Sequence, residues 1–155
     1  GRLHPGLRNL PQRKFKLTSM STIDDCRIIQ LPTIHNRQGN ITPINAGIDI
    51  DFDIKRVYYL YDVPGGAERG GHAHKQLRQL IVSVMGAFDV MVDDGTKRKT
   101  IRLDRAHYGL YIPTMIWREL DNFSSGAICL VLASLPYDET DYYRNYDEFL
   151  QALKK

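Results

Sequence analysis

Apolar and polar side chains alternate along most of the chain after residue 20, and turn residues interrupt this alternation about every eight to twelve positions. A period of two is typical of strands with one buried face, and such frequent turns are typical of a sandwich or barrel. Asp94-Gly95 favours a hairpin, and the Pro-Gly-Gly of residues 64–66 ends the first clear strand. We therefore predict an all-β fold, with strand-like segments at residues 54–62, 72–86, 87–95, 97–103, 107–113, 115–120, 127–134 and 136–146.

The C-terminal end of the chain has a helical pattern instead. Phe149, Leu150 and Leu153 can lie on one face of a helix, because residues three and four positions apart are neighbours on its surface. Asn145 or Asp147 can cap its first turn, since either side chain can accept a hydrogen bond from a backbone N–H. The sequence predicts one short C-terminal helix.

The composition indicates one ordinary globular domain. The chain has 155 residues, of which 43% are hydrophobic and 25% are charged. Its longest apolar run, residues 127–133, is far shorter than the roughly 18 residues of a membrane helix, so we expect no membrane association. The two cysteines, Cys26 and Cys129, cannot build a disulfide framework and lack the spacing of a zinc site. These features predict a soluble, cytoplasmic protein.

The positive charge is concentrated at the N-terminus. The net charge is +3, but residues 1–19 hold five basic and no acidic side chains, which leaves 16 basic and 18 acidic groups in residues 20–155. Because residues 20–155 carry a small negative net charge, we expect no basic surface for a phosphate backbone and therefore no nucleic-acid partner. We interpret residues 1–19 as a flexible basic leader or an extension added for expression, with a basic binding arm as the alternative. Residues 20–155 then form a single domain.

A histidine pair stands out in one strand-like segment. His72 and His74 are two positions apart, so both rings should project from the same face of a sheet. Such a pair is more often structural than functional, but its surroundings change this interpretation. Gly66, Gln79 and Gly86 complete the spacing G-x5-H-x-H-x4-E-x6-G, with Gln in place of Glu. This segment resembles the first motif of the cupin superfamily.

The second cupin motif is recognisable in a degraded form. Pro113 and Asn122 occupy their usual positions, whereas Met115 stands where glycine is usual and Arg118 where a histidine is usual. The two motifs together resemble those of a cupin, which implies a jelly-roll barrel.

The departures from the cupin motifs bear on metal binding. A cupin metal site takes two histidines and a carboxylate from the first motif and a third histidine from the second, all with lone pairs for the ion. Here the carboxylate is replaced by Gln79 and the last ligand by Arg118, which stays cationic and has no acceptor atom. We therefore expect no metal and no cofactor, and a pocket suited to an anionic or carbonyl-bearing ligand.

Without a metal, the histidines are candidates for proton transfer. Histidine has an unperturbed pKa of about 6.5, so His72 and His74 can take and return a proton near neutral pH. Arginine forks suit phosphate oxygens, whereas Lys55 is better explained as a solvated surface charge. By strand alternation, Tyr59 and Tyr61 lie on the face opposite to Tyr58. Candidate substrate-binding residues are Arg56, Tyr58, Arg69, Gln79, Tyr111 and Arg118.

Longer strings resemble one particular family. The segments KRVYYLYD, RGGHAHK, VDDG, GLYIPTMIWREL and LVLASLPYDETDYYRNYDEF are similar to those of the sugar-nucleotide 3,4-ketoisomerases, cupins that act on dTDP-4-keto-6-deoxyglucose. The resemblance implies that His72 and His74 are the active-site pair, that Arg69 and Arg118 lie in the pocket, and that the partner is a dTDP-linked 4-keto-6-deoxy sugar.

The resemblance also implies an assembly. Members of the family form homodimers that exchange an early strand, so residues 36–43 should help to line the pocket of the neighbouring subunit. The family's early signature D-x-R-G-x-L is present here as NRQGNI, with Gln38 at the arginine position and Arg37 beside it. Both residues are therefore candidates for substrate binding.

The activity implied is a shift of the carbonyl group from C4 to C3. A histidine removes the C3 proton, an enediolate forms and C4 is reprotonated, with His74 favoured as the base and His72 as its partner. Because some members have His at position 118 and this chain has Arg, which cannot donate a proton near neutral pH, we favour a product of gluco configuration at C4. The alternatives are a sugar-nucleotide 3,5-epimerase and a non-catalytic sugar-nucleotide-binding cupin.

Overall fold

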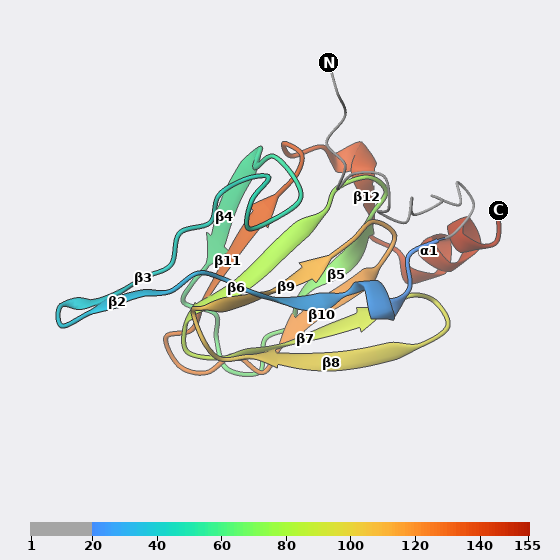
Figure 1. Cartoon of the computed structure of the whole chain (residues 1–155). Coiled ribbons are helices and arrows are strands. Elements are labelled where there is room, and N and C mark those ends of the chain that lie inside the picture. The colour runs from blue at the N-terminus through green and yellow to red at the C-terminus, as the bar shows by residue number, and fades with distance from the viewer. Residues whose placement is uncertain (1–19) are drawn as a thin grey trace, which may run out of the picture.

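Two five-stranded antiparallel sheets make up most of the computed structural model, which describes residues 20–155 (Figure 1). The first sheet has the order β1 (Arg27–Gln30), β9 (Tyr108–Ile112), β6 (Gln79–Met85), β11 (Ile128–Ala133) and β4 (Arg56–Leu60). The second has the order β12 (Tyr142–Tyr143), β5 (Arg69–His74), β10 (Trp117–Asp121), β7 (Phe88–Asp93) and β8 (Arg98–Leu103). The other elements are the hairpin strands β2 (Ile34–Asn36) and β3 (Gly39–Ile41), the 3-10 helices η2 (Ile23–Asp25) and η3 (Glu139–Asp141), and the helix α1 (Tyr146–Leu153).

The strand order confirms the predicted all-β fold with a short C-terminal helix. Neighbouring strands are mostly distant in the sequence, as in a jelly roll, where the chain crosses repeatedly between two sheets. The expected closed barrel needs a correction, because no strand ladder joins the two sheets within residues 20–155. Side-chain packing holds the sheets together instead, so the fold is a jelly-roll sandwich.

The main hydrophobic core lies between the inner faces of the two sheets. Alternating positions of the strands supply it, as the period-two pattern predicts. The ring of Phe88 stacks on that of Phe123 with their centroids 5.1 Å apart. Other nearly inaccessible members are Ile81, Val90, Val92, Leu103, Leu110, Ile112, Leu120 and Val131.

The segment predicted at residues 72–86 forms two strands rather than one. Strand β5 ends at His74 in the second sheet, and β6 begins at Gln79 in the first. The connection crosses between the sheets, and the backbone N–H of Lys75 donates to the carbonyl of Asp141 at 2.8 Å. The pattern of apolar and polar residues does not reveal the turn in this connection.

The second cupin motif keeps its backbone shape although its glycine is missing. Met115 has a φ of 59°, in the left-handed region that favours glycine. Its backbone N–H donates to the carbonyl of His74 at 2.8 Å, which ties the turn before β10 to the end of β5. This contact brings the two motif segments together.

Helix α1 packs behind the second sheet. Asn145 is its N-cap and accepts a hydrogen bond from the backbone N–H of Glu148 at 3.0 Å. Phe149 is completely buried in a cluster with Trp117 and Ala73. Ala73 lies between the two histidines in the sequence, so its side chain points to the other face of β5. The helix therefore supports the strand that carries the histidine pair.

The hairpin of β2 and β3 projects from the body of the molecule (Figure 1). All six strand residues are exposed, including Ile34 and Ile41, whose exposed fractions are 54% and 59%. Arg37 and Gln38 form the turn at its tip. The predicted leader, residues 1–19, lies outside the described residues. In the described part, no helix has the length and apolar character needed to cross a membrane.

Candidate active site

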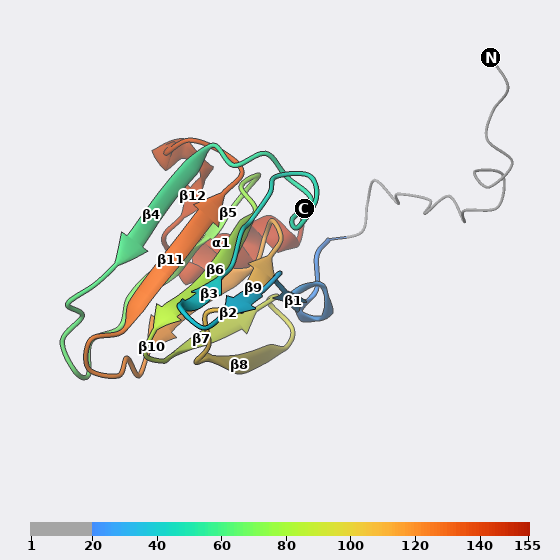
Figure 2. The same cartoon turned by 60° about the vertical axis from the view of Figure 1, so that its left-hand side comes forward.

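A polar cavity of about 270 Å³ lies between strands β4, β6 and β11 of the first sheet and β5, β10 and β12 of the second. Strand β4 is the edge strand of its sheet and runs beside β11 (Figure 2). Strand alternation turns Arg56 and Tyr58 towards the cavity and, as predicted, places Tyr59 and Tyr61 on the opposite face, which is exposed. The polar side chains of its wall are Arg56, Tyr58, Arg69, His72, Gln79, Arg118, Tyr137, Tyr142 and Arg144.

The histidine pair forms a hydrogen-bonded unit on strand β5. The Nε2 atoms of His72 and His74 are 3.1 Å apart, so the rings meet on one face of the strand, as predicted. Nδ1 of His74 lies 3.0 Å from Oδ2 of Asp141. His72 lines the cavity, whereas His74 is completely inaccessible and lies behind it. Three residues therefore form a line from the buried Asp141 to the cavity wall.

The buried position of His74 keeps its ring neutral. Burial lowers the pKa of His74 from its ordinary value of 6.5, and the positive charge of Arg118 lowers it further. The carboxylate of Asp141 accepts a hydrogen bond from Nδ1, which fixes the proton of the neutral ring on that nitrogen. A neutral His74 with its proton on Nδ1 has a lone pair on Nε2, where it faces His72.

A second hydrogen-bonded line crosses the cavity from Arg118. Its Nη1 donates to Oε1 of Gln79 at 2.7 Å, and Nε2 of Gln79 donates to the hydroxyl of Tyr58 at 3.2 Å. The Nε and Nη2 atoms of Arg118 both donate to the carbonyl of Ile116. A guanidinium has five N–H groups, so two more can point to a ligand. Burial lowers the pKa of Arg118 to about 10, which still leaves the side chain protonated at pH 7.

The position of Arg118 does not suit a metal ion. Its Cα pairs with that of His72 across strands β10 and β5, and its side chain binds Gln79 at the usual carboxylate position. A cation there would face a guanidinium, which has no lone pair to offer. Residues 20–155 contain no group of three His, Cys, Asp or Glu side chains placed to hold a metal. The donor set therefore does not fit a cupin metal.

Further arginines make the cavity suitable for an anion. Arg56, Arg69 and Arg144 line it together with Arg118. Arg56 lies over the ring of Tyr58, with its Cζ 4.5 Å from the centroid, and its Nη1 is buried without a hydrogen-bond partner. A buried N–H without a partner is costly. An anionic group of a ligand would satisfy it.

Most of the predicted site residues line this cavity, but four do not: His74 lies behind its wall, and Tyr111, Arg37 and Gln38 lie elsewhere. Tyr111 packs with Phe52 in a second cluster on the outer side of the first sheet, because strand alternation points it away from the cavity. Arg37 and Gln38 lie at the tip of the projecting hairpin instead of in the cavity of their own chain. Asp141 was not predicted as a site residue, although it lies in LVLASLPYDETDYYRNYDEF, one of the segments that resemble the 3,4-ketoisomerases.

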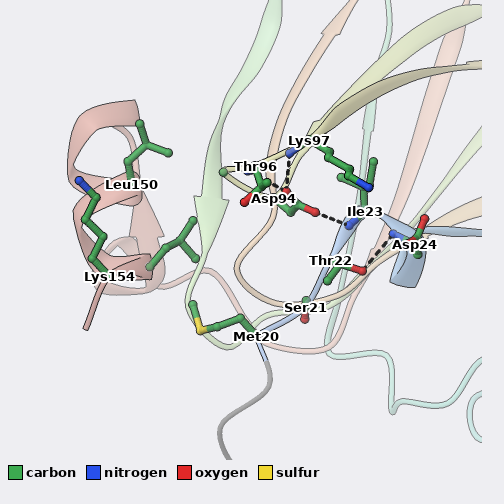
Figure 3. Close-up of a pocket in the computed structure, with 12 residues that line it drawn as sticks. Met20, Ser21, Thr22, Ile23, Asp24, Asp94, Thr96, Lys97, Leu150 and Lys154 are labelled. Carbon is green, nitrogen blue, oxygen red and sulfur yellow. Dashed lines mark hydrogen bonds between the residues drawn. The ribbon is translucent and has the colours of Figure 1, made fainter.

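A larger cavity, of about 630 Å³, lies elsewhere in the molecule. Figure 3 shows it between the segment that begins at Met20, the turn after β7 and the end of α1, where Leu150 and Lys154 lie. Asp94 accepts hydrogen bonds from the backbone there and so joins the first segment to the turn. The cavity contains neither histidine nor arginine. The predicted site residues His72, Arg69 and Arg118 instead line the smaller cavity.

The fold and this site together define a cupin-like protein whose cavity is lined by a histidine, tyrosines and arginines. The comparisons with known proteins place the chain more closely. The family model described as "FdtA: WxcM-like, C-terminal" matches residues 24–154. The chain is 42% identical over 129 residues to a TDP-4-oxo-6-deoxy-alpha-D-glucose-3,4-oxoisomerase of Aneurinibacillus thermoaerophilus. The aligned residues cover 83% of this chain and 93% of that protein.

Solved structures give the same answer. QdtA, a sugar 3,4-ketoisomerase from Thermoanaerobacterium thermosaccharolyticum in complex with TDP, has a TM-score of 0.84 and 41% identity, covering 86% of this chain and 97% of its own. The TDP-quinovose 3,4-ketoisomerase WlaRB from Campylobacter jejuni has a TM-score of 0.80 and 43% identity, covering 83% and 99%. The chain belongs to the FdtA family of 3,4-ketoisomerases and is an isomerase.

Proposed function

We propose that this protein converts dTDP-4-keto-6-deoxyglucose into the corresponding 3-keto sugar nucleotide. One relative is named for this substrate, and a solved relative carries TDP-4-keto-6-deoxyglucose itself. The observation that carries the proposal is the position of His72, which shares the cavity wall with the protonated Arg118. A base and a donor for an oxyanion therefore face the same small space.

The reaction moves a carbonyl group without net oxidation. A base removes the proton from C3, and the electron pair of that C–H bond forms a C3–C4 double bond while the C4 carbonyl oxygen becomes an enediolate oxygen. The C3 hydroxyl then loses its proton and C3 becomes the ketone, while C4 receives a proton and its oxygen becomes a hydroxyl. Arg118 and the hydroxyl of Tyr58 are donors for the developing negative charge.

We assign the base role to His72 and the partner role to His74, the reverse of the assignment made from sequence. His72 reaches the cavity, whereas His74 has no accessible surface and does not line it. A general base must come within hydrogen-bond reach of the carbon-bound proton that it removes. The place of His72 on the cavity wall, where a ligand can approach its ring, supports this assignment.

The product is proposed to have the gluco configuration at C4. Arg118 stays protonated and can orient the C4 oxygen, but it cannot supply the proton that returns to C4 near pH 7. In the gluco configuration the hydrogens at C3 and C4 lie on opposite faces of the ring, so the proton for C4 must reach the face opposite to the one from which the histidine removed the C3 proton. Its source is then solvent or a hydroxyl of the cavity rather than the base. The nucleotide diphosphate is assigned to Arg56 and Arg69, whose charges suit phosphate oxygens, whereas Arg144 already pairs with Glu139 through its Nε and Nη2.

Solvent deuterium tests the function directly. In D2O, a 3,4-ketoisomerase yields a 3-keto product with deuterium at C4, observable by NMR and mass spectrometry. Deuterium at C3 and C5 with the ketone still at C4 would identify a 3,5-epimerase. A substrate that binds without exchange would identify a non-catalytic sugar-nucleotide-binding protein.

Chelation should leave the activity unchanged. Gln79 and Arg118 stand at two of the four cupin ligand positions and bind one another, so no step is assigned to a metal. We expect full turnover after exhaustive EDTA treatment followed by gel filtration. Stoichiometric metal by elemental analysis, with activity that is lost on chelation and restored by the metal, would contradict this prediction.

A homodimer is proposed from the projecting hairpin. Its exposed strands β2 and β3, with Ile34 and Ile41, have too little packing of their own to be stable as an isolated hairpin in water. A second copy would cover them and place Arg37 and Gln38 near its cavity. Sedimentation at micromolar concentration should therefore show about twice the chain mass of 17.8 kDa. A single species at the chain mass would refute the dimer.

A further inference from the structure

Asp141 is the buried end of the line of side chains that leads to His72. Its Oδ1 accepts the backbone N–H of Gln76 at 2.7 Å, and its Oδ2 accepts that of Leu77 at 3.3 Å. Oδ2 also lies 3.0 Å from Nδ1 of His74. These contacts come from the turn that links β5 to β6, so the carboxylate is held in place by the backbone next to the histidine pair.

This arrangement determines where the protons of the histidine pair lie. A carboxylate accepts hydrogen bonds only, so Nδ1 of His74 must carry its proton. A neutral His74 then has a lone pair on Nε2. The contact of 3.1 Å between the two Nε2 atoms holds one proton, which must belong to His72. In a neutral His72 the lone pair is therefore on Nδ1.

From these contacts we infer that Asp141 is a positioning residue that sets the tautomer of both histidines through hydrogen bonds, and so makes His72 a proton acceptor. The inference rests on the proposed function, because it explains how the base of that reaction is prepared. Asp141 does not line the cavity and acts through His74. This role of Asp141 also explains why His74 is out of reach of a ligand and yet hydrogen-bonded to His72, which lies on the cavity wall.

The same line stabilises His72 after it has taken a proton. A protonated His72 still donates from Nε2 to the lone pair of His74, and the carboxylate lies at the far end of His74. A negative charge beyond a neutral imidazole favours the positive charge that forms on His72. The line therefore supports the intermediate as well as the resting state.

Asp141→Asn is the decisive variant. The amide oxygen can keep the shorter hydrogen bond, from the N–H of Gln76. The amide NH2 then replaces Oδ2, donates to Nδ1 of His74 and gives up the longer contact with the N–H of Leu77. The proton of His74 must then move to Nε2, and His72 must accept at Nε2 and carry its proton on Nδ1. We expect kcat to fall by about 10²-fold or more, with KM within about threefold of the wild type.

Asp138→Asn is the matched control. Asp138 caps the same 3-10 helix, η3, and is exposed, and asparagine is as good an N-cap as aspartate. The kcat of the Asp138→Asn variant should match that of the wild type.

A second control uses the His74→Asn background. There Asp141→Asn should cause little further loss of kcat, because the carboxylate no longer has a histidine to act on. A further loss as large as that in the wild type would show that Asp141 acts by another route and would overturn the inference.

Nitrogen NMR of histidine-labelled protein measures the tautomers without turnover. We expect the proton of His74 on Nδ1 and that of His72 on Nε2 in the wild type, and the reverse in Asp141→Asn. A wild type with the proton of His74 on Nε2, or an active wild type with unchanged kcat in Asp141→Asn, overturns the inference. A wild type without ketoisomerase activity overturns the proposed function instead, and the NMR result still tests the tautomers.

Discussion

Replacing His72 with asparagine is expected to lower kcat by about 10²- to 10⁴-fold, the usual contribution of a general acid–base group. The ring lies on the cavity wall and is hydrogen-bonded from behind by His74. Asparagine keeps a polar side chain of moderate size but cannot take a proton near pH 7. Binding of the nucleotide should change little, because the residues assigned to the diphosphate are the arginines. Steady-state kinetics with TDP affinity measured by calorimetry would show this division.

His74→Asn should also reduce kcat within this range, although His74 does not reach the cavity. The double variant should be little worse than the worse single one, because residues that act as a unit give non-additive losses. If His72→Asn and His74→Asn each retained more than about a tenth of wild-type kcat at pH 7, the pair would be structural. The base would then have to be found among the tyrosines of the cavity.

Strand alternation was enough to predict which side chains of β4 and β5 share a face. Residues two apart point the same way whatever the rest of the fold does, so His72 and His74 meet, and Tyr58 separates from Tyr59. The cupin spacing added Gln79 and Arg118, which the structure joins by a hydrogen bond of 2.7 Å. These predictions depend on local geometry and on motif spacing, and both can be read from one sequence.

Depth and long-range contacts could not be predicted in this way. Asp141 lies 67 residues after His74, and its contact arises only because β12 pairs with β5. The same period that placed Tyr58 correctly left the direction of Tyr111 undetermined, since alternation does not say which face of a strand is inside. The sequence also favoured His74 over His72 as the base, whereas the structure buries His74 completely and leaves His72 on the cavity wall.

Arg118 is expected to control reprotonation at C4 as well as binding. Its guanidinium is fully buried, and hydrogen bonds to Ile116 and Gln79 hold it in one orientation. A donor held in place before the reaction stabilises an oxyanion without the cost of reorganisation, and loss of one such donor lowers kcat by about 10²- to 10³-fold. If Arg118 were only an anchor for the ligand, its loss would raise KM and leave kcat unchanged.

Arg118→His tests this role, because histidine at this position can donate a proton to C4, which arginine cannot do near pH 7. We expect kcat to fall by about 10²- to 10³-fold or the product to change its configuration at C4, alone or together with Gln38→Arg on the hairpin. Arg69→His is the matched control, since Arg69 lines the cavity but is exposed, and it should change KM without changing the product. NMR of the reduced product gives the configuration at C4. The role of Arg118 in reprotonation would be refuted by native kcat and an unchanged C4 configuration, both in Arg118→His alone and together with Gln38→Arg. An arginine that only anchors the ligand affects binding and leaves the chemical step unchanged.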